Sequence, residues 1–206
     1  MIELPYRIVQ KIAKYFAKCI AQTITRLKLA GNGVSYGKKH NYKGVPFLKV
    51  DRNAKCIIGD YFSCNSGISN PIGRGSGTFI VVAAGASLSI GSHVGISNTA
   101  INCYEQIDIG DHVKMGGGVV IYDTDFHALD YQTRAVRQLD LAQKKTLPVK
   151  IENHVFIGAH STILKGVTIG ARSVVGACSV VTKSIPSDEI WAGNPARFIR
   201  KTAAND

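Results

Sequence analysis

The sequence predicts an all-β fold: a parallel β-helix of hexapeptide repeats, with an N-terminal amphipathic α-helix and one inserted loop. The main observation is an aliphatic residue at every sixth position, at Ile151, Ile157, Ile163, Ile169, Val175 and Val181. Glycine follows three of these residues, and the same phase occurs upstream at Cys103, Ile109, Met115 and Ile121. A period of six fits neither an α-helix nor a hairpin array, and is typical of short parallel strands that wind round a prism.

The length supports one sizeable core. The chain has 206 residues, of which 45% are hydrophobic, so a second full domain is not expected. Each coil of a β-helix buries its aliphatic residues only by stacking on the next coil. We therefore divide the chain into a basic helix (1–33), a β-helix domain (34–185) with a protruding insert (122–150), and a C-terminal tail (186–206).

Residues 5–29 have the pattern of an amphipathic helix. Its apolar positions recur at helical spacing, at Ile8, Ile12, Phe16, Ile20, Ile24 and Leu27. Its other positions are rich in basic residues, at Arg7, Lys11, Lys14, Lys18, Arg26 and Lys28. Because most amphipathic helices serve packing, we expect the apolar face to pack on the rest of the protein or on a neighbouring subunit. The alternative is docking on an anionic membrane surface.

The net charge and the cysteines limit which classes of partner and which cellular compartment are expected. The net charge is +11, which favours nucleic acid, anionic lipid or a phosphate-rich small molecule. The five cysteines are scattered, which predicts free thiols in a reducing compartment. No secretory signal or membrane-spanning run is visible. We therefore expect a cytoplasmic protein, with contact to the inner membrane face through the N-terminal helix as an alternative.

The repeat is broken in two places. Between Ile96 and Cys103 the phase slips by one residue, which predicts an extra residue and a bulge. Residues 122–150 have no aliphatic period, and the repeat resumes at Ile151 in its old phase. A loop of this length within a compact domain is usually functional or disordered. His127 lies in it, where the repeat would place an aliphatic side chain, so we expect the histidine to face outwards.

The repeats at 84–121 and 151–181, "DTDFH" in the insert and "GACSVVTKSIP" with "AGNPARFIRK" near the end carry a resemblance. The sequence resembles the hexapeptide-repeat acyltransferases, a left-handed β-helix family that includes maltose, galactoside and xenobiotic O-acetyltransferases and enzymes acting on polysaccharides. The resemblance covers about residues 84–201. It implies a left-handed β-helix, acetyl-CoA as co-substrate, no metal, and a homotrimer with its active sites between neighbouring prisms.

The resemblance also implies a mechanism. His127 would act as general base, taking a proton from an acceptor hydroxyl while that oxygen attacks the acetyl thioester directly. The implied acceptor is a sugar hydroxyl, in a surface polysaccharide or a related glycan, and no nucleic acid is expected. Asp123, Asp125 and Asp130 could orient His127 or bind the acceptor. For at least two of them we expect a solvated loop or an Asx-turn instead.

Further site residues follow from the resemblance. Coenzyme-binding positions are implied at Phe156, Gly158, Ala159, Gly176, Ala177, Thr182, Lys183, Arg197 and Arg200. Small residues would let the pantetheine arm reach the main chain, and the arginines suit phosphate. Ordinary surface charge is the alternative for the basic residues. Phe156 stands where relatives often carry tryptophan. Substrate-binding positions are implied at Asn98 and Asp125.

Two other functions compete with an acetyltransferase. A zinc carbonic anhydrase on the same fold needs three converging histidines. The six histidines are His40, His93, His112, His127, His154 and His160, and none form the close His-x4-His pair expected for that class. A non-catalytic β-helix scaffold is the second alternative. The insert that carries His127 argues against it.

Overall fold

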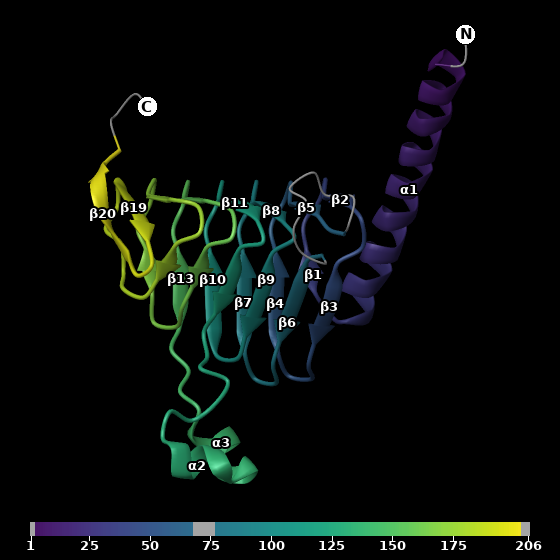
Figure 1. Cartoon of the computed structure of the whole chain (residues 1–206). Coiled ribbons are helices and arrows are strands. Elements are labelled where there is room, and N and C mark those ends of the chain that lie inside the picture. The colour runs from purple at the N-terminus through teal and green to yellow at the C-terminus, as the bar shows by residue number, and fades with distance from the viewer. Residues whose placement is uncertain (1–2, 68–76, 203–206) are drawn as a thin grey trace.

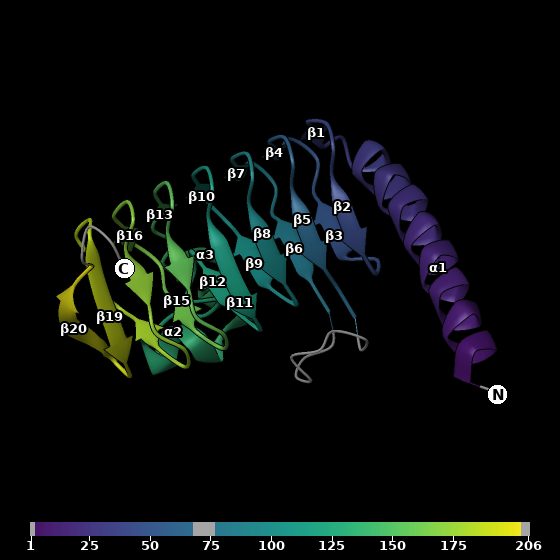
Figure 2. The ribbon, with the colours of Figure 1, turned by 90° about the horizontal axis from the view of Figure 1, so that it is seen from above.

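The computed structural model describes residues 3–67 and 77–202. The outermost residues of the predicted helical segment (1–33) and of the predicted tail (186–206) lie outside these ranges. Short parallel strands wind into three sheets that form the walls of a prism, with a long helix at one end (Figures 1 and 2). The predicted parallel β-helix with an N-terminal helix is therefore confirmed.

Each turn of the chain contributes one strand to each wall. Sheet A contains β1 (Ser35–Tyr36), β4 (Lys55–Ile58), β7 (Ser87–Ile90), β10 (Gln106–Ile109), β13 (Val149–Ile151) and β16 (Thr168–Ile169). Sheet B contains β2 (Asn41–Lys43), β5 (Ser63–Asn65), β8 (Gly95–Ser97), β11 (Lys114–Gly117), β14 (Phe156–Ile157), β17 (Val174–Val175), β19 (Glu189–Gly193) and β20 (Ala196–Lys201). Sheet C contains β3 (Phe47–Val50), β6 (Phe79–Val82), β9 (Ala100–Cys103), β12 (Val120–Tyr122), β15 (Thr162–Ile163) and β18 (Val180–Val181).

The six-residue repeat fills the prism. Side chains of the same row stack in register, as Ile109 on Ile151 and Ile151 on Ile169 do in sheet A. The repeat's aliphatic residues from Ile151 to Val181 are all buried. The region before residue 84, which has no clear period in the sequence, nevertheless adds coils to the same three sheets. Its inward positions include Cys56, Ile58 and Cys64.

The glycines that follow the repeat's aliphatic residues do not turn the corners of the prism. Gly158, Gly170 and Gly176 do not adopt positive φ; the residues two positions later do, with φ of 61° at His160, 62° at Arg172 and 58° at Cys178. A Cβ at Gly158 would lie 2.4 Å from the backbone nitrogen of Ala177 in the next coil. Glycine is needed there because adjacent coils approach too closely for a side chain.

We therefore expect Gly158→Ala to destabilise the protein by about 1–3 kcal/mol, the usual cost of overpacking. Thermal unfolding followed by circular dichroism measures the change. Gly31→Ala is the matched control, because a Cβ at Gly31 meets no atom within 4 Å. Equal stability of the two variants would contradict the packing role of Gly158.

The irregularity lies in a different strand from the predicted one. Gly95 pairs with Lys114 but Ser97 pairs with Gly117, so β11 holds one more residue than β8 between these two pairs, and the corners that follow the two strands have the same length. The prediction of an extra residue before Cys103 was wrong. Both Ile101 and Cys103 of β9 are buried, and counting sixes from Cys103 took the wrong one as the partner of Ile121.

The helix α1 (Glu3–Gly31) packs only through its C-terminal part. Ala21, Thr25 and Leu29 are buried against the first coil, whereas residues 5–20 are exposed. The rest of the described chain does not cover the apolar face at residues 5–20, because the helix continues past the prism (Figure 2), and packing of this face on a neighbouring subunit stays a prediction. Within residues 3–67 and 77–202, no helix is both long and apolar enough to cross a membrane.

Candidate active site

The insert is an ordered stalk that leaves the prism between β12 of sheet C and β13 of sheet A. Its two legs pair with each other: the Asp125 N–H donates to the Lys145 carbonyl at 3.0 Å, and the Leu147 N–H donates to the Asp123 carbonyl at 2.9 Å. The outer part folds into two short helices, α2 (Tyr131–Ala135) and α3 (Arg137–Gln143), which project away from the prism (Figure 1).

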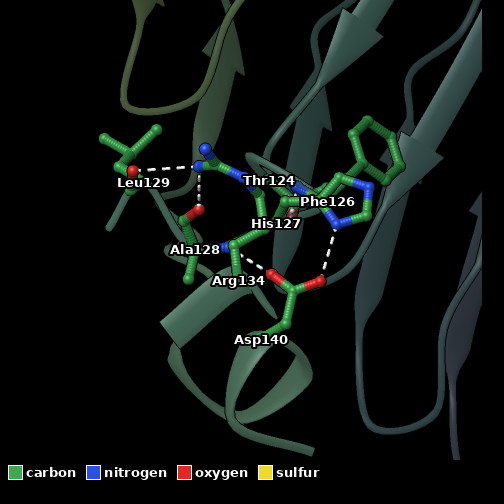
Figure 3. A network of polar contacts seen from close by, with 7 residues as sticks. All are labelled: Thr124, Phe126, His127, Ala128, Leu129, Arg134 and Asp140. Atoms are coloured by element: carbon green, nitrogen blue, oxygen red, sulfur yellow. Dashed lines mark hydrogen bonds and ion pairs between the residues drawn. The ribbon is translucent and has the colours of Figure 1, made fainter. Parts of the chain in front are cut away.

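His127 lies near the start of this outer part and is paired with a carboxylate from α3. Its Nδ1 is 2.7 Å from Oδ2 of Asp140, and the other oxygen, Oδ1, accepts the Ala128 N–H at 2.7 Å (Figure 3). The Asp140 side chain is 10% exposed, whereas that of His127 is 66% exposed. The pair therefore has a fixed, buried carboxylate and an accessible imidazole.

The pairing determines which ring nitrogen of His127 carries the proton in the neutral imidazole. The hydrogen bonds from His127 and from the Ala128 N–H lower the pKa of Asp140 below its ordinary value. An ionised carboxylate only accepts hydrogen bonds, so Nδ1 of His127 is the donor. In the neutral ring Nε2 then carries the lone pair, which is the arrangement that a general base requires.

Two further residues hold the segment that carries His127. Arg134 of α2 donates from Nη1 to the carbonyl oxygens of Ala128 at 2.8 Å and Leu129 at 2.9 Å (Figure 3). Asp130 caps α2 by accepting the Thr133 N–H at 2.7 Å, and this bond lowers the pKa of the Asp130 carboxyl. Such a cap stabilises the first turn of the helix by satisfying one of its free N–H groups.

The flanking aspartates do not orient His127. Asp123 is fully buried and accepts the N–H groups of Tyr104 and Glu105, which fixes the stalk to the neighbouring coil. Asp125 pairs through Oδ1 with Lys165 of the following coil, and Asp130 is a helix cap. The suggestion that one of these three orients the base was wrong for all three.

Asp140 was missed because its pairing is not local. It lies thirteen residues after His127, in "RQLDLAQ", and reaches the imidazole only because the chain folds back as α2 and α3. The available signal was weak: Asp140 is the first acidic residue after Asp130 in a segment otherwise rich in basic and amide side chains.

The small residues predicted to bind the coenzyme lie on one edge of the prism, between sheets B and C. Gly158 and Ala159 follow β14, and Gly176 and Ala177 follow β17 one coil later. The Gly158 N–H donates to the Val175 carbonyl at 2.7 Å, which stacks the two pairs. Gly158 is buried and Gly176 is half-buried, and the packing of adjacent coils already requires both glycines.

The larger coenzyme candidates occupy two other places. Phe156 is 49% exposed and lies in the row of sheet B that continues through Val174 and Ile190 to Arg200. Arg197 is exposed on the same terminal strand, β20. Thr182 and Lys183 are exposed after β18, on the edge between sheets C and A from which the insert leaves two coils earlier.

Asn98 is on the same edge as the small residues. It turns the corner after β8 with φ of 43° and is 5% exposed. Its Oδ1 accepts the Gly67 N–H at 3.0 Å, which ties this corner to the coil before it. The structure thus gives Asn98 a local tether, and its predicted contact with substrate stays a prediction.

One chain does not bring the base and the predicted coenzyme edge together. The insert with His127 leaves from the edge between sheets C and A, while Gly158 and Gly176 line the edge between B and C. The two edges are the opposite ends of the sheet C strands.

Comparison with known proteins identifies the repeat. The family profile described as "Bacterial transferase hexapeptide (six repeats)" matches residues 148–183. Residues 148–183 therefore carry the hexapeptide repeat that this profile describes. The parallel strands, the repeat and the solved structures with this fold confirm the left-handed β-helix expected from the resemblance.

Individual curated proteins are similar in sequence to this chain over part of its length. The galactoside O-acetyltransferase of Escherichia coli K12 is 35% identical over 124 residues, covering 59% of this chain and 58% of its own length. The chain spans about half the length of the curated relatives it matches, 43% and 58% for the first two.

Two solved structures share the fold. The N-acyltransferase AntD from Bacillus cereus has a TM-score of 0.62 at 21% identity, over 87% of this chain and 89% of its own. A maltose O-acetyltransferase from Clostridium difficile 630 has a TM-score of 0.55 at 24% identity, over 93% of this chain and 89% of its own.

The histidines of the hexapeptide-repeat chain do not converge on a metal. His93, His112 and His154 stack face to face at successive corners, with ring centroids 4.7 Å apart in each pair. Over residues 3–67 and 77–202, no group of three or more His, Cys, Asp or Glu side chains has the arrangement of a metal site. This geometry gives no support to the zinc carbonic anhydrase alternative.

Proposed function

We propose that the protein is an acetyl-CoA-dependent O-acetyltransferase that acetylates a sugar hydroxyl, with His127 as the general base. The observation that carries the proposal is the His127–Asp140 pair, because it directs Nε2 of an exposed imidazole towards solvent on an ordered stalk. The hexapeptide repeat and the similarity to the galactoside O-acetyltransferase of E. coli support acetyl transfer.

The proposed reaction is a direct transfer. Nε2 of His127 accepts the proton of the acceptor hydroxyl while the acceptor oxygen attacks the thioester carbon. The new C–O bond forms, the C–S bond breaks, and the coenzyme leaves as a thiolate that takes the proton back from the imidazolium. Asp140 holds the ring and stabilises its positive charge, as a carboxylate partner of a catalytic histidine does.

The proposed site lies between subunits of a trimer. The separation of His127 from the edge with Gly158 and Gly176 supports this arrangement, because the stalk projects away from its own prism (Figure 1). In the assembly the stalk of one subunit would overhang the coenzyme edge of the next. The basic residues Lys183, Arg197 and Arg200 are proposed to contact the coenzyme phosphates.

Asp125 is proposed to bind the acceptor. Its Oδ1 is held by Lys165, while its Oδ2 is buried and has no hydrogen-bond partner within the described residues. A buried carboxylate oxygen without a partner costs free energy, which a sugar hydroxyl donating to it would recover. Asp125 lies two residues before His127, at the foot of the stalk.

The test is release of the coenzyme thiol from acetyl-CoA in the presence of a panel of sugars, oligosaccharides and amino sugars. We expect acceptor-dependent thiol release with at least one hydroxyl acceptor, and an ester in the product by mass spectrometry. Acylation confined to amino groups would replace the O-acetyltransferase assignment. No acceptor-dependent release across the panel, with acetyl-CoA binding also absent by calorimetry, would favour a non-catalytic scaffold.

A further inference from the structure

The helix α1 presents an apolar surface that no other part of the described chain (3–67 and 77–202) covers. We define the apolar stripe as Ile8, Ile12, Phe16 and Ile20, which recur every four residues along one side. These side chains are 50%, 50%, 60% and 58% exposed, respectively. Large apolar side chains exposed in a row mark an interaction surface rather than ordinary solvent contact.

The stripe faces away from the prism. Ala21, Thr25 and Leu29 are the buried residues of the helix, and they mark the side of α1 that contacts the first coil. At 3.6 residues per turn the stripe lies roughly 160° round the helix from this buried side. The helix is therefore oriented with its apolar surface outward, beyond the end of the β-helix.

Basic residues occupy the opposite side of the same segment. Arg7, Lys11, Lys14 and Lys18 lie within a narrow arc of the helix that continues the direction of the buried side. All four are exposed. This division is that of a helix lying in a membrane interface, with its apolar side in the acyl boundary and its cations among the headgroups.

The positive charge of the whole protein is concentrated at this end. Residues 1–50 contain ten lysines and arginines and one acidic residue, Glu3, whereas residues 51–206 contain fifteen basic and thirteen acidic residues. Lys38, Lys39, Lys43 and Lys49 continue the basic surface of α1 onto the first coil, where all are exposed. The body of the prism is close to neutral by comparison.

We infer that α1 docks the protein on a bilayer that contains anionic lipid. The outward apolar stripe fits the acyl boundary of such a bilayer, and the basic end of the protein fits its anionic headgroups. A second copy of α1 could cover the stripe, but it would leave the basic side without an opposite charge. Since α1 crosses the end of the coil stack (Figures 1 and 2), the stack points away from the membrane.

Co-sedimentation of the full-length protein with vesicles tests this inference. We expect binding to vesicles of phosphatidylcholine with phosphatidylglycerol, weakened by salt, and little binding to phosphatidylcholine alone. Phe16→Glu should reduce partitioning at least about tenfold more than Gln10→Glu, because only the first also removes an aromatic side chain that would insert into the bilayer. Gln10→Glu introduces the same acidic side chain into the same segment of α1 outside the stripe, and both positions are exposed, so neither variant should alter thermal unfolding.

Two results would overturn the inference. One is equal partitioning of Phe16→Glu and the unchanged protein. The other combines two observations: the unchanged protein does not bind vesicles, and Phe16→Glu forms a smaller oligomer than the unchanged protein in sedimentation velocity. That result would assign the stripe to contact with a second copy of the chain. The inference does not depend on the proposed acetyltransferase activity, and Phe16→Glu is expected to leave turnover of a soluble acceptor unchanged.

Discussion

Replacing His127 with alanine is expected to lower kcat for acetyl transfer by roughly 10²–10⁴, the range typical of a lost general base. The imidazole is 66% exposed, so its removal should cost little stability. Steady-state kinetics with saturating acetyl-CoA measures the effect, and the KM for acetyl-CoA should stay close to that of the unchanged enzyme because the proposed role of His127 is proton transfer from the acceptor and not coenzyme binding.

The control for this variant is His154→Asn, another exposed histidine, at a corner where φ is 62° and asparagine is tolerated. It should retain full activity. An unchanged kcat for His127→Ala would remove the proposed mechanism.

The subunit arrangement can be tested with the same variant. Co-refolding His127→Ala with Arg197→Ala/Arg200→Ala should restore part of the activity, because some interfaces then combine an intact base with an intact coenzyme edge. If mixed assemblies form and stay inactive, the base and the coenzyme contacts belong to one subunit.

Asp140→Asn is expected to lower kcat by at least about tenfold, and by no more than His127→Ala does. Asparagine can keep the bond from the Ala128 N–H through Oδ1. Its amide would then donate to Nδ1 of His127, which places the ring proton on Nε2 and removes the base, as in other histidines paired with a carboxylate. Kinetics and thermal unfolding on the same samples measure the effect.

The matched control is Asp130→Asn, the same substitution in the same insert. Asparagine is as good an N-cap as aspartate, so the bond to the Thr133 N–H is kept and kcat should be nearly unchanged. Equal losses in the two variants would show that Asp140 acts only by holding the insert together. A fall in kcat at Asp140 with KM and unfolding unchanged identifies it as a positioning residue for the base.

The parts of the fold that could be predicted are those that repeat locally. Ile151, Ile157 and Ile163 each enter a different wall of the prism, and their six-residue spacing is the length of one wall and one corner. The exit of the chain before His127 was also predictable, because the core cannot accept a polar ring without a partner. The corner after Ile96 could not be counted correctly, since β9 offers two inward residues, Ile101 and Cys103.

The candidate site could be predicted only in part from the sequence, for a related reason. A histidine on an insert can be recognised from its place in the sequence, whereas its partner depends on how the insert folds back. Asp123, Asp125 and Asp130 are closer to His127 in sequence than Asp140 is, yet each is engaged elsewhere. Sequence proximity favoured the wrong carboxylates because hydrogen bonds depend on distance in space.

The sequence by itself determined the β-helix, the position of the insert and the amphipathic character of α1. These features depend on periodic burial, and periodicity along a chain is visible without coordinates. Only the tertiary structure decided that Asp140 pairs with His127, that Gly158 is required by the next coil, and that the apolar stripe of α1 faces away from its own prism. Each of these depends on contacts between residues far apart in sequence, which are fixed only when the coils stack and the insert folds.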